Sequence, residues 1–278
     1  MNAPNQVALN QGAPASLALV GAGKMGSALL GGWLAAGVEP ARIAVYELSP
    51  SPALLALAEE KGFALNGPRT PAEAVVLAVK PQALGATAAG IASLFGRDSF
   101  LLSILAGKTV RNLATRLPVS AILRAMPNTP AAIGRGVTGV FANDATSADQ
   151  RAKAQFLLSG VGAVEWVERE SLIDAVTAIS GSGPAYVFHL VEALAQAGAQ
   201  LGLPADLALR LARATVEGSG ELLHREPELS AETLRRNVTS PGGTTQAALD
   251  VLMAPEGLAA LMARAAVAAR KRAEDLSG

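Results

Sequence analysis

The chain has 278 residues, with 23 basic and 23 acidic side chains and no cysteine. At about 150 residues per domain this length predicts two domains, and it excludes a small disulfide-stapled protein. The lack of cysteine excludes thiolate catalysis and cysteine-ligated zinc, and it favours a reducing cytoplasm as the compartment. Because the net charge is zero, there is no overall basic field to attract nucleic acid or an anionic membrane surface, and neither is an expected partner.

The first sixteen residues lack the basic start and the long apolar stretch of a signal peptide, and we expect residues 1–16 to form a flexible tail. No run of about twenty apolar residues follows without interruption. The longest candidate, Ala175 to Val191, is broken by Ser180-Gly181-Ser182-Gly183-Pro184. The sequence therefore predicts no transmembrane helix.

From Leu17 onward, short apolar runs alternate with segments long enough for helices, as in a parallel βαβ sheet. The expected strands are Leu17–Val20, Ile43–Glu47, Ala74–Val79, Leu101–Leu105 and Ala121–Met126. Their continuous hydrophobicity predicts that helices cover both faces of the sheet. Two further runs, Val137–Ala142 and Ala163–Val167, flank an expected helix at Ser147–Ser159, and we place both at the edge of the same sheet. The predicted fold class is α/β, with a doubly wound parallel sheet of the Rossmann type over residues 17–168.

After Val167 the strand signal ends, and segments rich in alanine and leucine continue to the C-terminus. We expect an all-helical second domain over residues 169–278. Its predicted helices are Ser171–Ile179, Pro184–Leu201, Ala205–Arg225, Ala231–Asn237, Thr244–Met253 and Glu256–Leu276. Several of them lack a broad polar face, so that one partner surface does not suffice to bury their apolar residues. This pattern predicts an intertwined homodimer.

A glycine-rich motif follows the first expected strand directly and opens a helical run at Ser27–Leu34. The motif consists of Gly21, Ala22, Gly23, Lys24, Met25 and Gly26. In a dinucleotide-binding turn the first glycine permits the tight turn, the second lets pyrophosphate approach the backbone, and the third packs the helix against the strand. The start of the helix then offers free N–H groups and a partial positive charge to the phosphates.

Glu47 stands 21 residues after Gly26 at the end of the second expected strand, where an acid typically holds the hydroxyls of the adenosine ribose. The alternative is an ordinary surface glutamate at a strand end. No arginine follows in Leu48-Ser49-Pro50-Ser51 to pair with a 2′-phosphate, which favours NADH over NADPH. Ser49 and Ser51 could still hydrogen-bond a phosphate.

The ends of the next two expected strands carry further candidates. Lys80 lies in Val79-Lys80-Pro81-Gln82 after one strand, and Ala106-Gly107 follows the other. Because ligands of open α/β sheets bind outside the carboxyl ends of the strands, Lys80 is a candidate contact for cofactor or substrate. A solvated lysine at the start of a loop is the equal alternative.

The acid and base side chains of the helical half limit its chemistry. Of six lysines in the chain only Lys271 lies there, and we interpret His189 and His224 as structural. Reduction of a ketone generally needs a proton donor such as Lys, His or Tyr, whereas a protonated imine is already electrophilic. This small set of acid and base side chains therefore favours an imine over a hydroxy acid as the substrate. It also predicts no metal site. A sensor that binds NAD(P)H without turnover is the alternative from another class.

Two segments of the helical half combine hydroxyls with glycine amides, Ser180–Tyr186 and Val238–Thr245, the second before an expected helix. Each could be mere capping, since Ser and Thr commonly satisfy free N–H groups at helix starts. For Val238–Thr245 a small carboxylate bound at the helix N-terminus is equally consistent.

The motifs together resemble those of pyrroline-5-carboxylate reductases from about Ser16 to Arg272. They are Gly21–Ala28, Ala78–Pro81, Arg124–Pro130, Asp174–Tyr186 and Val238–Thr245, in the order of that family. The resemblance implies NAD(P)H-dependent reduction of L-1-pyrroline-5-carboxylate to L-proline, the last step of proline biosynthesis. It also implies a Rossmann domain followed by a helical domain for dimerisation and substrate binding.

The resemblance further implies roles for individual residues. Besides the glycine motif, the dinucleotide contacts would be Ala78, Val79, Lys80 and Pro81, with Ala106 and Gly107 beside the nicotinamide. The substrate carboxylate would lie against Ser240, Gly242, Gly243, Thr244 and Thr245, and the Thr245 hydroxyl, the expected catalytic group, near the ring nitrogen. Glu170 and Asn237 match positions that contact substrate and cofactor, respectively. The segment Glu47-Leu48-Ser49-Pro50 departs from the residues typical of the family, so that Glu47 and the weak preference for NADH rest on the local pattern alone.

Overall fold

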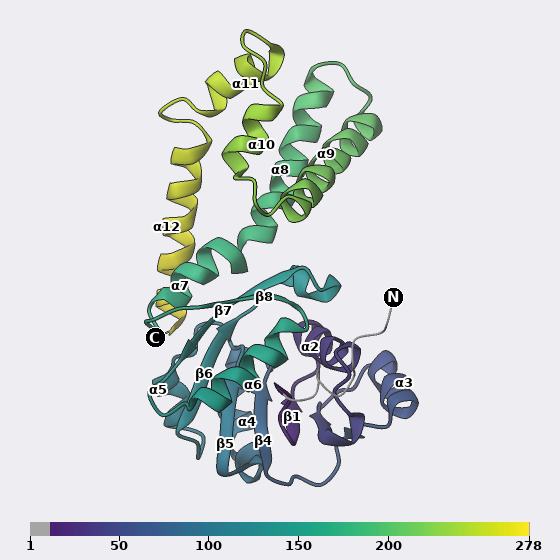
Figure 1. Cartoon of the computed structure of the whole chain (residues 1–278), viewed down its shortest axis with the longest axis vertical. Coiled ribbons are helices and arrows are strands. Elements are labelled where there is room, and N and C mark those ends of the chain that lie inside the picture. The colour runs from purple at the N-terminus through teal and green to yellow at the C-terminus, as the bar shows by residue number, and fades with distance from the viewer. Residues whose placement is uncertain (1–11, 278) are drawn as a thin grey trace. The chain divides into compact units, whose positions relative to one another are not determined.

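A computed structural model describes residues 12–277 (Figure 1). The chain forms two compact units. The first contains the chain up to Gly181 and again from Arg270 onward, and the second contains Ser182–Ala269. Residues 1–11 of the expected tail lie outside the described residues.

The first unit is built on an eight-stranded sheet in the order β3-β2-β1-β4-β5-β6-β7-β8. Its strands are β1 Leu17–Val20, β2 Ile43–Tyr46, β3 Ala64–Leu65, β4 Ala72–Leu77, β5 Phe95–Ser103, β6 Ala121–Met126, β7 Gly136–Ala142 and β8 Gly162–Trp166. All neighbouring strands run parallel except β6 and β7, which are antiparallel. Chain order reverses beside β1, which lies between β2 and β4, and this reversal is the switch point of a doubly wound sheet. The predicted edge position of β7 and β8 is confirmed, whereas β3 is too short to leave a periodic signal.

Helices cover both faces of the sheet. Successive strand residues point to opposite faces, so that Leu17 and Leu19 lie in one apolar core while Ala18 and Val20 lie in the other. The first core is closed by α2 (Lys24–Ala35), α3 (Pro52–Lys61) and α6 (Ala148–Ser159), and the second by α4 (Leu84–Ile91) and α5 (Val110–Ala114). Trp33 of α2 is fully buried and donates its indole N–H to the Leu157 carbonyl of α6 over 2.8 Å. The predicted doubly wound α/β fold is confirmed.

Residues 12–16 differ from the expected flexible tail because they pack against the sheet. Ala13 is buried, and the Ser16 hydroxyl accepts the backbone N–H of Glu73. The first unit also continues beyond the expected division at residues 168 and 169. The helix α7 (Leu172–Val176) and the π-helical turn Thr177–Gly181 bury Ile173 and Ala178 in this unit.

The second unit is entirely helical, as predicted. It contains α8 (Gly183–Gln200), α9 (Ala205–Arg225), α10 (Ala231–Asn237), α11 (Thr244–Leu252) and the first part of α12 (Leu258–Ser277). The helices α8 and α9 approach closely at Gly198, where an added Cβ would lie 3.1 Å from the Cβ of Ala208. None of the helices in the described part of the chain is both long enough and apolar enough to cross a membrane.

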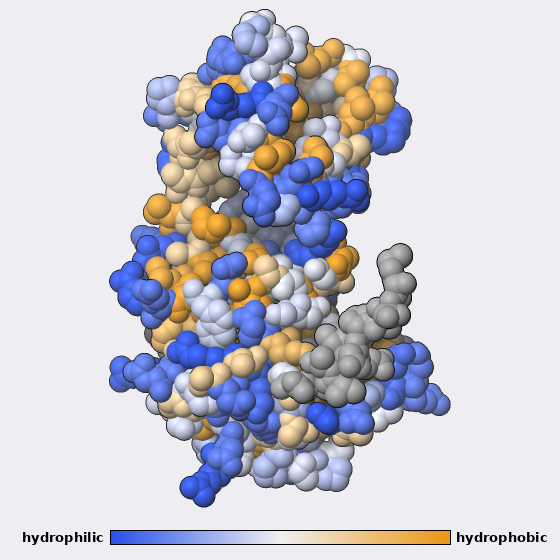
Figure 2. Space-filling view, viewed as in Figure 1, coloured by the Kyte–Doolittle hydropathy of each residue, from blue (hydrophilic) through white to orange (hydrophobic). Residues whose placement is uncertain are grey.

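The second unit leaves much of its apolar surface uncovered. Among its described residues, α8 and α11 contain no buried side chain, and α9 buries only Ala208 and Ala212. Figure 2 shows hydrophobic residues on the visible face of α8 and α9. The exposed apolar side chains include Val187, Phe188, Leu190, Leu194, Leu209, Leu211, Leu222, Leu223, Val251, Leu252 and Met253.

Candidate functional site

A pocket of about 490 Å³ opens where β1, β2 and β4 end. Ligands of doubly wound sheets bind in this crevice, outside the carboxyl ends of the strands at the switch point. Six of the sequence-predicted residues line it: Gly21, Gly23, Glu47, Ala78, Val79 and Lys80. The structure therefore brings together three segments that are distant in sequence, and in each the residues come directly after a strand.

The glycine motif has the shape that a dinucleotide requires. Gly21 has a φ of +94°, and a Cβ there would lie 2.7 Å from the Ala78 carbonyl oxygen, so no other residue fits. At Gly26 a Cβ would lie 2.2 Å from the Gly21 oxygen. By contrast, nothing lies within 4 Å of a Cβ at Gly23, which is the open side of the turn. The turn thus leaves room for a pyrophosphate in front of the α2 N-terminus.

The other motif residues lie around this turn. Gly23 is the residue before α2, and no described side chain caps the helix there. Ala22 and Met25 are half-buried, and Met25 packs against the first core. Lys24 is exposed at the first residue of the helix. Pro81 begins the short 3₁₀ turn Pro81–Ala83 next to the pocket, and Lys80 precedes it with its side chain in solvent.

Glu47 connects the end of β2 to the glycine motif. Its Oε2 accepts the Ala22 backbone N–H over 2.7 Å, and its Oε1 accepts the Ser49 N–H over 3.0 Å. The side chain is half-buried at the pocket wall. The carboxylate is therefore held in one orientation where β2 ends.

The pocket contains residues that the sequence did not single out. They are Tyr46, Leu48, Asn66 and Arg69. Asn66 is the one non-glycine residue with positive φ among the residues described, at +52°. Asparagine tolerates this conformation, and Asn66-Gly67-Pro68 is a turn signal that could have been noticed in the sequence.

The loop after β5 contains Ala106 and Gly107. Gly107 has a φ of +66° and packs closely against the end of α12, where an added Cβ would lie 3.1 Å from the Leu276 Cβ. Ala106 is exposed. The last turn of the chain therefore supports this loop, and no local pattern shows that contact.

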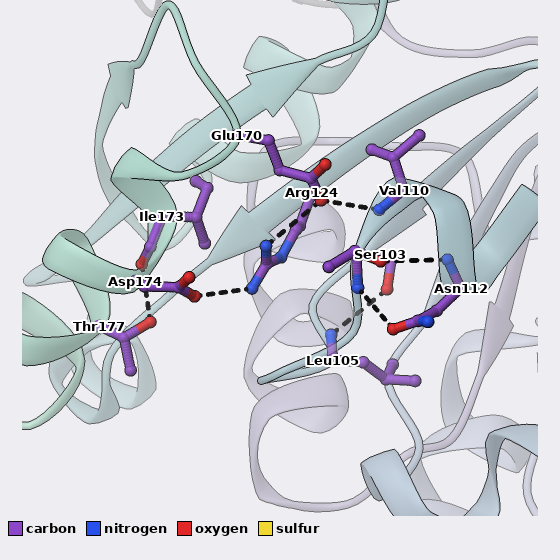
Figure 3. A network of polar contacts seen from close by, with 10 residues as sticks. Ser103, Leu105, Val110, Asn112, Arg124, Glu170, Ile173, Asp174 and Thr177 are labelled. Carbon is purple, nitrogen blue, oxygen red and sulfur yellow. Dashed lines mark hydrogen bonds and ion pairs between the residues drawn. The ribbon is translucent and has the colours of Figure 1, made fainter. Parts of the chain in front are cut away.

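Glu170 belongs to a buried ionic network in the first unit (Figure 3). Its Oε1 accepts the Val110 N–H at the start of α5 over 2.7 Å and lies 3.3 Å from the Arg124 guanidinium. Arg124 also donates to Asp174 Oδ1 over 3.1 Å, and only 3% of its side chain is exposed. The network joins β6, α5 and α7, because a buried guanidinium needs a carboxylate partner.

The remaining predicted residues belong to the second unit. Asn237 ends α10 and is exposed. In the loop that follows, Gly242 has a φ of +71° and the Gly243 N–H donates to the Ser240 carbonyl over 3.0 Å. Thr244 and Thr245 are the first two residues of α11, which no described side chain caps. Free N–H groups and hydroxyls therefore converge at this helix start.

Metal ligation has no support in this part of the molecule. Across the described residues, no group of three or more His, Cys, Asp or Glu side chains is placed to hold a metal ion. The donors present at the pocket are instead backbone amides, an arginine, a lysine and an asparagine. They suit a nucleotide with phosphates.

The fold and the pocket define a Rossmann-type dinucleotide-binding protein that carries a helical C-terminal domain. Residues 16–107 match the family described as NADP oxidoreductase, coenzyme F420-dependent, and residues 170–276 match the family described as pyrroline-5-carboxylate reductase dimerisation. The chain belongs to the pyrroline-5-carboxylate reductase family, which confirms the resemblance seen in its motifs.

Similar proteins cover nearly the whole chain. The pyrroline-5-carboxylate reductase of Pseudomonas aeruginosa is 39% identical over 268 residues, which are 94% of this chain and 96% of that protein. The enzyme of the same name from Synechocystis is 45% identical over 204 residues, 73% of this chain and 75% of the relative. The solved pyrroline-5-carboxylate reductase of Coxiella burnetii has a TM-score of 0.87 at 36% identity, covering 95% of this chain and 99% of its own. The Plasmodium falciparum pyrroline carboxylate reductase, solved with NADP bound, has a TM-score of 0.77 at 26% identity, and the match covers 95% of this chain and 98% of that one.

Proposed function

We propose that this protein reduces L-1-pyrroline-5-carboxylate to L-proline and uses a nicotinamide dinucleotide as the reductant. The observation that carries the proposal is the glycine turn at the switch point of the sheet, open at Gly23, in a chain 39% identical to a reductase of that name. When bound, the reduced cofactor supplies the hydride that converts the C=N bond to an amine. Because the imine is already protonated when the hydride arrives, hydride addition completes the amine, and the protein has to hold and orient the two reactants.

The cofactor site consists of the glycine turn, Glu47, Ala78–Pro81 and the Ala106-Gly107 loop, and Asn237 stays a cofactor contact predicted from the family resemblance. The turn and the N-terminus of α2 bind the pyrophosphate. Glu47 binds the ribose hydroxyls, because its carboxylate is held by two backbone N–H groups at the pocket wall. A fixed negative charge favours two hydroxyls over a 2′-phosphate, so NADH is the preferred cofactor.

The substrate site is formed by the loop Ser240–Thr245 and the start of α11. The uncapped N–H groups of α11 and the hydroxyls of Ser240 and Thr244 bind the carboxylate of the imine. The Thr245 hydroxyl oxygen accepts a hydrogen bond from the N–H of the protonated ring nitrogen and so orients the imine. Glu170 stays a substrate contact predicted from the family resemblance, and its Oε1 is held by Val110 and Arg124.

Most of the rate acceleration comes from orientation. Holding two reactants in register contributes about 7–11 kcal/mol in favourable cases, whereas general acid help is typically about 10²–10⁴-fold. A protonated imine is already electrophilic, so that a threonine hydroxyl that orients it is sufficient where a ketone would need an acid. The scarcity of lysine and histidine in the helical half is consistent with this chemistry.

The helical unit associates with a second copy of the chain. Its match to a family defined by dimerisation shows self-association as its role, and the exposed apolar side chains of α8, α9 and α11 provide the surface. We propose a homodimer in which these helices interlock. The cytoplasmic location remains a prediction from the sequence.

The test is steady-state oxidation of NADH and of NADPH with pyrroline-5-carboxylate as substrate, with proline measured by mass spectrometry. Turnover that forms one proline for each oxidised cofactor supports the proposal, and a higher kcat/KM with NADH supports the role of Glu47. If a folded, nucleotide-binding protein forms no proline with either cofactor, the reductase assignment is wrong and a sensor becomes the better reading.

A further inference from the structure

Arg69 lines the same pocket as Glu47, although 22 residues separate the two in sequence. It belongs to the loop between β3 and β4. Its guanidinium lies over the Tyr46 ring, with the Cζ atom 5.5 Å from the ring centroid. Arg69 is exposed and forms no ion pair within the described part of the chain.

The loop that carries Arg69 is held firmly to the end of β2. Asn66 accepts the Glu47 N–H over 3.0 Å through its side-chain oxygen and donates to the Glu47 carbonyl over 2.8 Å, while its own N–H donates to Val45. The Tyr46 hydroxyl donates to the Pro68 carbonyl over 3.0 Å. Since Tyr46 is buried, the ring is a fixed platform for the guanidinium. Stacking leaves the N–H edge of an arginine free for a phosphate.

The charges in this pocket are unequal. Arg69 and Lys80 are its two cations, and Glu47 is its one carboxylate among the lining residues. The carboxylate accepts two backbone N–H groups, which disperse part of its charge. Burial raises the pKa of Tyr46 above its usual value, which the positive charge of Arg69 partly offsets. The tyrosine is therefore neutral near pH 7 and adds no negative charge beside the guanidinium.

From this arrangement we propose that Arg69 is the specificity-determining residue that binds the 2′-phosphate of NADPH. It allows the pocket to accept NADPH in addition to the NADH that Glu47 favours. The inference rests on the cofactor site proposed above. A planar guanidinium forms bidentate, charge-assisted hydrogen bonds with phosphate, and the 2′-hydroxyl of NADH lacks that group. The arginine thus contributes to the binding of one cofactor and not of the other.

The experiment compares adenosine 2′,5′-bisphosphate with AMP by isothermal titration calorimetry, because the two probes differ only in the 2′-phosphate. The proteins are the full-length wild type, Arg69→Gln, Arg69→Lys and the control Arg97→Gln, which removes an exposed arginine outside the pocket. We expect Arg69→Gln to weaken the bisphosphate about tenfold and AMP less than twofold, because charge-assisted hydrogen bonds are lost only with the former. Arg69→Lys keeps the positive charge but loses the bidentate guanidinium. Its affinity for the bisphosphate is expected to lie between those of the wild type and Arg69→Gln.

Kinetics provide a second readout in the same variants. For Arg69→Gln the KM for NADPH should rise about tenfold while kcat and the KM for NADH stay within twofold, and Arg97→Gln should match the wild type. An equal loss of affinity for both probes in Arg69→Gln would show that Arg69 only holds the loop. An unchanged affinity for the bisphosphate would show that Arg69 does not contact the 2′-phosphate. Either result overturns the assignment. Because the titrations need no imine, they test Arg69 even if pyrroline-5-carboxylate is not reduced.

Discussion

The two glycines at positions 23 and 26 permit a matched test of how the dinucleotide turn works. They lie in the same turn, but their surroundings differ. A Cβ at Gly26 would lie 2.2 Å from the Gly21 oxygen and 3.4 Å from the Ala78 Cβ. A Cβ at Gly23 would meet no atom within 4 Å, and the backbone there, with φ −67° and ψ −168°, suits any residue.

Substitution by alanine should therefore separate stability from cofactor binding. At Gly26, alanine gains about 1 kcal/mol of helix propensity, but the contact with a backbone carbonyl forces a shift of the kind that costs about 1–3 kcal/mol or more. We expect Gly26→Ala to lower the free energy of unfolding by about 1–2 kcal/mol. At Gly23 the loss of free energy of unfolding is limited to the preference for glycine over alanine at the N-cap, about 1 kcal/mol at most. The added methyl group at Gly23 instead occupies the space in front of the α2 N-terminus.

The assay combines thermal unfolding with calorimetric titration of NADH. Gly26→Ala should lower Tm by roughly 2–8 °C, since about 1 kcal/mol corresponds to about 2–4 °C in chains of this size. Gly23→Ala should keep a Tm close to that of the wild type, yet bind NADH at least about tenfold more weakly, the equivalent of about 1.4 kcal/mol. A Gly23→Ala protein with unchanged affinity, or a Gly26→Ala protein as stable as the wild type, would refute the role assigned to this turn.

Three further changes test other parts of the structure. Thr245→Ala should lower kcat about hundredfold without unfolding the protein, with most activity kept in Thr245→Ser; unchanged kinetics would remove Thr245 from the mechanism. Arg124→Met leaves Asp174 buried without its cation and should cost about 3–5 kcal/mol in urea unfolding, and a loss below about 1 kcal/mol would contradict the network. Burial lowers the pKa of Lys153, but hydrogen bonds and charges from Asp149 and Glu73 outweigh it and raise the pKa above its usual value. Since a raised folded pKa stabilises the fold below the unfolded value of about 10.4, the Tm difference between wild type and Lys153→Gln should be constant from about pH 7 to 9 and shrink above about pH 10.4.

The strands and the glycine turn could be predicted because their signals are local. Short, mostly apolar runs such as Leu17–Val20 and Ala121–Met126 became strands at those bounds, since strands covered on both faces are mainly apolar, and Arg124 is tolerated within the second because it is paired with carboxylates. β5 starts earlier than expected, at Phe95, because its first part is exposed and lacks that signal. α7 was expected to run to Ile179, but its hydrogen bonds change to a π turn from Thr177.

The pocket contains a residue that no local sequence pattern indicates. No phosphate-binding arginine directly follows Glu47 in the sequence, whereas the tertiary structure places Arg69 in the same pocket. The reason is that β3 pairs with β2, so the loop after β3 returns to the end of β2 and is held there by Asn66. A two-residue strand leaves no periodicity by which this return could be recognised.

The sequence by itself determined the α/β class, the dinucleotide turn and the family, because each apolar run, glycine turn and family motif is a pattern of a few consecutive residues. Only the tertiary structure decided which distant groups meet. It brought Glu170 to Val110 and Arg124, Leu276 to Gly107, and Arg69 to the pocket. These contacts depend on strand order and on the return of the chain end to the first unit, and they arise from long-range packing that no local pattern encodes.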